Sequence, residues 1–175
     1  SEQKYMNTNS VDFFKNNKMI QPAKEQEIIL AVWEIGNPGN IGQIIRLAHN
    51  LGAKKVLFIN DEINFRSSKI KKTAGFSFEQ MDWEFISQAS FNKLLNAEFQ
   101  LTVLETCEGS KNIFTTNLPD KIILLAGSES FGLPDEIINK SYFQVHIPMP
   151  GDCKSMNISQ ALSVAAFEWF RQKTT

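Results

Sequence analysis

The chain has 175 residues, of which 42% are hydrophobic and 21% are charged, and its formal net charge at pH 7 is −1. A chain of this length and composition is typical of one globular domain with a substantial core. The near-zero charge neither supports nor excludes a nucleic-acid partner. No apolar run approaches a membrane span of roughly 20 residues, and nothing at the N-terminus resembles a signal peptide.

The cysteine content points to a reducing compartment. Cys107 and Cys153 are the only two cysteines, and they show neither the spacing of metal ligands nor a disulfide framework. We therefore expect a cytoplasmic protein with no metal site and no membrane partner.

The first part of the chain divides into a polar lead-in and a strand–helix–strand unit. Residues 1–27 are expected to be loosely ordered, with a short helix around residues 10–17, and residues 28–175 to form a single domain. The apolar run 28–33 predicts a strand buried on both faces. After a dense turn signal at residues 36–40, apolar residues recur at helical spacing as far as a C-cap at Gly52.

The rest of the chain continues this alternation. Strands are predicted over residues 55–59, 83–86, 101–106, 121–126 and 143–147, and helices over residues 65–74, 91–97 and 158–170, with a short helix whose first residue is Pro134. The pattern predicts an α/β fold with a mainly parallel sheet and helices on both faces.

Residues 37–46 are the first segment suited to binding. Two glycines and an asparagine between a buried strand and a helix allow close approach by a ligand, and the helix N-terminus favours an anion. Arg46 falls at the second turn of that helix, where its forked guanidinium suits a phosphate. The alternative is a tight turn followed by an amphipathic helix with a solvated arginine.

Residues 127–132 are the second such segment, because ligands of open α/β sheets bind beyond the carboxyl ends of the strands. Gly127 would let the backbone meet a ligand, and Glu129 is a lone carboxylate among small residues. The alternative is that Glu129 merely favours the N-terminal side of the next helix. Neither a G-x-G-x-x-G nor a Walker sequence occurs in the chain.

Residues 147–157 are the third segment. Pro148 and Pro150 must end the preceding strand because proline lacks a backbone N–H. Asn157 and Gln160 have the spacing of a capping box for the helix that follows. Helix capping explains Ser155 and Asn157 as well as a catalytic role does. His49 and His146 stand alone in the sequence, and we expect them to be structural.

Taken together, the three segments resemble the three signature motifs of the SpoU (TrmH) family, in the SPOUT class of RNA methyltransferases. Residues 40–46 are similar to Asn-x-Gly-x-x-x-Arg, and residues 125–132 to Gly-x-Glu-x-x-Gly after an apolar strand. Residues 147–159 resemble the third motif, with Met156 where the family usually has leucine. The resemblance covers about residues 28–173.

The resemblance implies more than the spacing of residues does. It implies a C-terminal deep trefoil knot, although knots are rare in proteins, and S-adenosyl-L-methionine bound in the knotted loops. It also implies a homodimer that methylates a ribose 2′-hydroxyl in tRNA or rRNA. The cofactor-binding positions that it implies are Thr106, Gly127, Ile147 and Met156. The catalytic or RNA-handling positions are Asn40, Arg46, Glu129, Ser155 and Asn157.

Methyl transfer from a sulfonium is an in-line displacement that depends mostly on positioning and needs no metal. The family view often makes the arginine a base, but a guanidinium with a pKa above about 12 rarely gives up its proton. Our hypothesis is that Arg46 grips the phosphate beside the target ribose, and that Ser155 and Asn157 hold Arg46 in place.

Two surfaces are candidates for partners. The helix over residues 158–170 is apolar almost all round, which suits a sheet on one face and a twofold dimer on another; the alternative is a helix buried wholly in its own domain. The basic run 66–72 suits RNA phosphates or is simply a solvated helix face. No added substrate-binding domain is expected, so this domain or its dimer would choose the RNA.

Two other functions compete with a methyltransferase. One is a non-catalytic RNA-binding or assembly protein that keeps the fold, against which the intact set of motif residues argues. The other is an α/β enzyme for a different nucleotide, which the missing phosphate loop disfavours.

Overall fold

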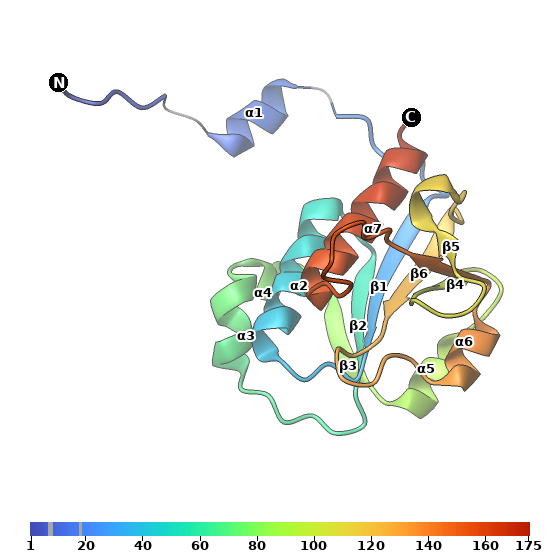
Figure 1. Ribbon diagram of the computed structural model, residues 1–175. Helices are drawn as coiled ribbons and strands as arrows, with labels where there is room; N and C mark the ends of the chain where they lie inside the picture. The colour runs from blue at the N-terminus through green and yellow to red at the C-terminus, as the bar shows by residue number, and fades with distance from the viewer. Residues whose placement is uncertain (7–8, 18) are drawn as a thin grey trace.

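The computed structural model describes residues 1–6, 9–17 and 19–175, and it is built on one seven-stranded sheet (Figure 1). The strand order is β3-β2-β1-β6-β4-β7-β5, and every strand pair within the described residues is parallel. The strands are β1 Glu27–Trp33, β2 Lys55–Ile59, β3 Trp83–Ile86, β4 Gln100–Leu104, β5 Lys111–Asn112, β6 Lys121–Ala126 and β7 Phe143–His146. The predicted α/β class with a parallel sheet is confirmed.

Helices cover both faces of the sheet, as predicted. One face packs against α2 Pro38–Leu51, α3 Ser67–Ala74, α4 Ser77–Gln80 and α7 Ile158–Lys173, and the other against α5 Gln88–Leu94 and α6 Asp135–Lys140. A 3-10 helix spans Ile113–Thr115. In the described residues, no helix combines the length and the apolar character needed to cross a membrane.

The central strand β1 shows why both faces must be covered. Ile28, Leu30 and Val32 belong to the core beneath α2 and α7, whereas Ala31 and Trp33 belong to the core beneath α5 and α6. Successive side chains of a strand point to opposite faces, so a strand of continuous apolar residues needs a layer on each side.

The predicted lead-in carries a short helix, α1 Ser10–Asn16 (Figure 1), which has no buried residue and whose Phe14 and Lys15 border a depression together with Phe167 and Phe170 of α7. Asn9 caps this helix by accepting hydrogen bonds from the backbone of Val11 and Asp12. Residues 7, 8 and 18 of the lead-in lie outside the described residues.

Helix α2 begins earlier than the turn signal predicted. The Asn37 side chain accepts hydrogen bonds from the backbone N–H of Gly39 at 2.8 Å and of Asn40 at 3.2 Å. Pro38 occupies the first helical position, where its missing N–H costs nothing. Asn40 therefore lies in the first turn of a helix rather than in a loop, and its side chain is fixed by the direction of that helix. The predicted C-cap is confirmed at Gly52, with φ of +72°.

Other boundaries also differ from the predictions. Helix α5 starts at Gln88 because Ser87 caps it through the backbone of Ser90. Pro134 is the residue before α6 rather than its first residue. No sequence pattern predicted α4, β5 or the 3-10 helix, because each is too short to show a hydrophobic period.

Close packing of α2 against α3 explains Gly42 of the first motif. A Cβ atom at Gly42 would lie 2.0 Å from Thr73 Oγ1 and 2.3 Å from the Ile70 carbonyl oxygen. The Thr73 hydroxyl also donates a hydrogen bond to the Gly39 carbonyl at 2.8 Å. The missing side chain at Gly42 therefore serves the close packing of two helices.

Replacing Gly42 with alanine should consequently destabilise the fold. Added atoms in a filled contact typically cost about 1–3 kcal/mol, and we expect the free energy of unfolding in urea to fall by about that amount. Gly36→Ala is the matched control, because a Cβ there meets no atom within 4 Å. Equal stability of the two variants would show that the α2–α3 contact is not tight.

Candidate active site

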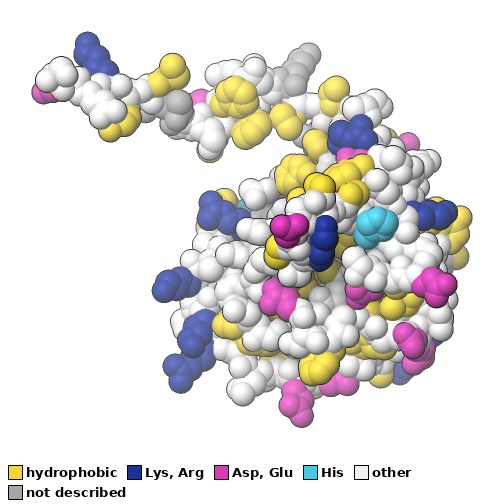
Figure 2. Space-filling model, viewed as in Figure 1, with side chains coloured by type: hydrophobic (Ala, Val, Ile, Leu, Met, Phe, Trp, Pro, Cys, Tyr) yellow, Lys and Arg dark blue, Asp and Glu magenta, His cyan; other side chains and the backbone are white. Residues whose placement is uncertain are grey.

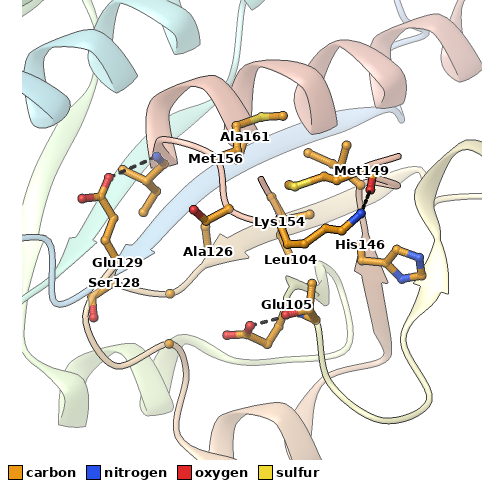
Figure 3. Close-up of a pocket in the computed structure, with 16 residues that line it drawn as sticks. Leu104, Glu105, Ala126, Ser128, Glu129, His146, Met149, Lys154, Met156 and Ala161 are labelled. Carbon is orange, nitrogen blue, oxygen red and sulfur yellow. Dashed lines mark hydrogen bonds between the residues drawn. The ribbon is translucent and has the colours of Figure 1, made fainter. Parts of the chain in front are cut away.

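The carboxyl ends of β4, β6 and β7 and the start of α7 enclose a cavity of about 320 Å³ (Figure 3). The four residues predicted to bind the cofactor line this cavity: Thr106, Gly127, Ile147 and Met156. Three loops far apart in the sequence thus supply one site. The structure brings these residues together, and their contact with a cofactor stays a prediction.

The loop after β6 is held in a tight turn by two glycines. A Cβ atom at Gly127 would lie 2.6 Å from the carbonyl carbon of Gly132, so the two backbones touch. Gly132 has φ of +67°, a conformation that glycine adopts without strain. Its N–H donates to the Ser128 carbonyl at 3.0 Å. At Gly127 the absence of a side chain therefore serves the turn itself.

Glu105 was not predicted as part of the site, although it lines the cavity. Its carboxylate accepts one hydrogen bond from the Thr106 N–H at 3.0 Å (Figure 3) and another from the Leu133 N–H at 3.3 Å. It thereby ties the end of β4 to the far end of the β6 loop. No sequence spacing signals this role, because the two partners are 27 residues apart in the chain.

Three predicted catalytic side chains form one hydrogen-bonded cluster. The Asn157 Nδ2 donates to Asn40 Oδ1 at 3.2 Å, and the Asn40 Nδ2 donates to Glu129 Oε1 at 3.4 Å. The same carboxylate oxygen accepts the backbone N–H of Ile158 at 3.3 Å (Figure 3). All three motifs therefore meet at the N-terminus of α7.

The predicted N-cap of this helix is confirmed. Asn157 Oδ1 accepts the backbone N–H of Ser159 at 2.9 Å and of Gln160 at 3.4 Å. Among the hydrogen bonds of the described residues, the reciprocal bond of a capping box from Gln160 is absent. The helix terminus that Glu129 engages is that of α7, and not that of α6, which follows it in the sequence. An anionic carboxylate is stabilised at such a terminus.

A second cleft, of about 550 Å³, adjoins the cavity. The β1–α2 loop and the β6 loop form its walls, and Ser128, Glu129 and Ile158 line both spaces. Asn40 also borders the cleft. Glu129 therefore stands between the cavity and the cleft.

Arg46 lies apart from this cluster. Helices α2 and α7 run side by side in the same direction, with Asn40 against Asn157 and Gln43 Oε1 2.7 Å from the Ser159 hydroxyl. One turn further on, the exposed Arg46 lines a separate depression together with Ser163 of α7. No hydrogen bond among the described residues joins Arg46 to Ser155 or Asn157. Within one chain, those two residues do not hold Arg46 as we expected.

Ser155 and the two histidines have local partners. Ser155 lines the cavity, in a loop that Lys154 stabilises by donating to the Met149 carbonyl at 2.9 Å. His49 Nδ1 lies 2.8 Å from the Ser77 hydroxyl, and His146 Nδ1 lies 3.0 Å from that of Ser110. These contacts are consistent with the structural roles predicted for both histidines, although His146 also lines the cavity.

Neither cysteine lines the cavity, and both are free thiols. Burial and the nearby Glu105 raise the pKa of the Cys107 thiol, whereas hydrogen bonding with the Ser155 backbone lowers that of Cys153. The part of the chain that the structure describes holds no group of three or more His, Cys, Asp or Glu side chains placed to bind a metal ion.

Comparison with known proteins places this site in a family. The model of the SpoU rRNA Methylase family matches residues 27–167. The chain is 30% identical over 147 residues to the tRNA (cytidine(34)-2′-O)-methyltransferase of Escherichia coli K12, covering 82% of this chain and 92% of that protein. It is also 30% identical over 159 residues to the uncharacterized tRNA/rRNA methyltransferase YfiF of Escherichia coli O157:H7, covering 87% of this chain and 44% of that protein.

Solved structures agree with this assignment. The fold matches an AdoMet-bound rRNA methyltransferase from Sinorhizobium meliloti with a TM-score of 0.77 and 26% identity, over 89% of this chain and 60% of that one. The chain spans 44% of the first curated relative and about 60% of several others. With the family model covering most of the chain and all three motifs meeting at one site, the protein belongs to the SpoU rRNA Methylase family.

Proposed function

We propose that the protein transfers a methyl group from S-adenosyl-L-methionine to a ribose 2′-hydroxyl in tRNA or rRNA. The observation that carries this proposal is the convergence of the three motifs on one cavity and one adjoining cleft. The name of the Escherichia coli K12 relative, a 2′-O-methyltransferase of which this chain spans 92%, supports the same chemistry.

The residues around the cavity suit this cofactor. Apolar side chains such as Leu104, Ile147 and Met156 offer a surface for a flat base, while the loop backbones after β4, β6 and β7 offer polar groups. The carboxylate of Glu105 lies in the same wall, where it suits a cationic ligand. When bound, the cofactor supplies an electrophilic methyl group on a sulfonium.

The cleft beside Glu129 is where we place the target ribose. Oε1 of Glu129 is engaged by Asn40 and by the Ile158 N–H, while Oε2 has no hydrogen-bond partner among the described residues. A ribose hydroxyl in the cleft could donate to that second oxygen. The asparagine and the helix terminus would keep the carboxylate fixed, which favours positioning over movement during the transfer.

We also propose the finer features that the family resemblance implies. Residues 28–175 would form the single catalytic domain, and the chain after β6 would thread the trefoil knot. Residues between β7 and α7 line the cavity, in the part of the chain where the resemblance implies the knotted loops. The two free cysteines suit the cytoplasm, where tRNA and rRNA are modified.

A twofold dimer through α7 is part of the proposal. Val164, Phe167 and Phe170 follow each other at three-residue spacing on α7, and each is at least partly exposed. The Phe167 side chain is 45% exposed and lines the same depression as Arg46. A dimer that covers this stripe would therefore place Arg46 at the edge of the interface.

The RNA phosphates would meet the basic side of the molecule. Dark-blue side chains gather at the left of Figure 2, where α3 lies in Figure 1. Lys71 forms a salt bridge with Glu79 at 3.2 Å, whereas Arg46, Lys69 and Lys72 take part in no salt bridge among the described residues. Arg46 and Lys72 line one depression, which gives phosphates two unpaired cations.

Binding of the cofactor is the first test. Titration calorimetry with S-adenosylhomocysteine should give saturable binding, and Ala161→Phe, which fills the cavity, should weaken it at least about tenfold. Gln160→Phe is the control, because this exposed neighbour on α7 does not line the cavity. Absence of binding by the unaltered protein would favour the alternative of a non-catalytic RNA-binding protein.

The dimer has its own test. The unaltered protein should have twice the mass of one chain by light scattering at micromolar concentration, and Phe167→Glu should convert it to a monomer because a charge cannot be buried unpaired. Leu94→Glu changes a side chain of similar exposure, 47%, on α5 and should leave the mass unchanged. A monomeric unaltered protein would refute the dimer.

Arg46→Lys tests the phosphate role. Lysine keeps the charge but not the two-pronged hydrogen bonding of a guanidinium, so we expect methyl transfer to RNA from a strain lacking the gene to fall at least about tenfold in kcat/KM. Arg66→Lys, an exposed arginine at the start of α3, serves as the control. Near-normal turnover of Arg46→Lys would remove any role that needs the guanidinium.

A further inference from the structure

Phe131 is exposed to solvent on the loop after β6, which also carries Glu129. Its side chain is 92% exposed, more than any other large hydrophobic side chain in the described chain. It lines the cleft in which we place the target ribose. Exposing a phenyl ring to water is unfavourable, and such a residue at the rim of a polar cleft suggests contact with a ligand.

The backbone beneath Phe131 is fixed. The Phe131 N–H donates to the Ser128 hydroxyl at 3.2 Å, and the next residue, Gly132, donates to the Ser128 carbonyl at 3.0 Å. Contact between the Gly127 and Gly132 backbones closes the turn. The backbone that carries the ring is therefore constrained. The side chain has only two torsions to restrict, so little conformational entropy is lost when a ligand covers the ring.

The other groups of the cleft define what can lie against the ring. Glu34 and Glu129 both line the cleft, so a phosphate there would meet two carboxylates. The uncharged Asn37, Asn40 and Ser130 supply hydrogen-bond donors and acceptors. A flat, uncharged group with polar edges fits this combination, whereas a phosphate does not.

We propose that Phe131 stacks on the nucleobase of the nucleotide whose ribose is methylated. This inference rests on the proposed function, because it places the ribose beside Glu129. With the ribose there, its base extends within the same cleft, and Phe131 is the aromatic side chain that lines it. Proteins recognise unpaired bases by stacking on aromatic rings, and such stacking tolerates any base because each has a flat π-face.

The stacking role predicts an order among three variants. Removing a stacking ring typically weakens binding by roughly 5- to 150-fold per base. Phe131→Ala should therefore raise the KM for RNA by that factor, with methyl transfer measured on RNA from a strain lacking the gene. Phe131→Tyr keeps the ring and should stay within about twofold of the unaltered protein, while Phe131→Leu should resemble the alanine variant.

Two controls separate the possible failures. S-adenosylhomocysteine affinity and the urea midpoint should be unchanged in all three variants, because the exposed ring lies outside the cofactor cavity. Normal RNA KM in Phe131→Ala, or full recovery by leucine, would overturn stacking. A changed mass by light scattering would instead assign the ring to a contact between chains.

Failure of the proposed function is distinguishable from failure of this inference. If the unaltered protein methylates no RNA, the function fails, and stacking is then tested by anisotropy with a labelled single-stranded RNA oligonucleotide. Weaker binding of that probe by Phe131→Ala and not by Phe131→Tyr would support the stacking contact. Equal binding by the two variants would overturn it.

Discussion

The contact between the first turn of α2 and the N-terminus of α7 is the constraint on which the site depends. Asn157 caps α7 with its Oδ1 and reaches Asn40 with its Nδ2. Asn40 in turn donates a hydrogen bond to the Glu129 carboxylate, which also accepts the backbone N–H of Ile158, the first residue of α7. One cluster thus satisfies a helix terminus, joins three distant segments and orients the carboxylate between the cavity and the cleft.

The glycines of the motifs allow the close packing of the elements that surround that cluster. Gly42 lets α3 lie against α2, and the pair Gly127 and Gly132 closes the β6 loop on itself. A side chain at either contact would move a functional group, because α3 carries the basic residues and the β6 loop carries Glu129 and Phe131. The ligand-binding surface is therefore shaped by contacts within the protein before any ligand is present.

Charge is divided between two parts of the molecule, although the whole chain is nearly neutral. Unpaired cations gather on α3 and at Arg46, whereas carboxylates border the cleft. This division suits a substrate whose phosphates lie outside the cleft and whose ribose and base enter it. Because the opposite charges nearly cancel in the whole chain, overall composition could not indicate the proposed RNA partner.

The sequence by itself determined the α/β class, most strands, the caps at Asn157 and Gly52, and several of the residues that line the cavity, among them Thr106, Gly127, Ile147 and Met156. These features depend on local periodicity, turn chemistry and motif order, which a linear chain displays. Only the tertiary structure decided that Glu105 ties two loops, that Arg46 lies apart from the polar cluster, and that Phe131 stands exposed. Each depends on which elements pack side by side, because a hydrogen bond or an exposed face between distant segments leaves no period in the sequence.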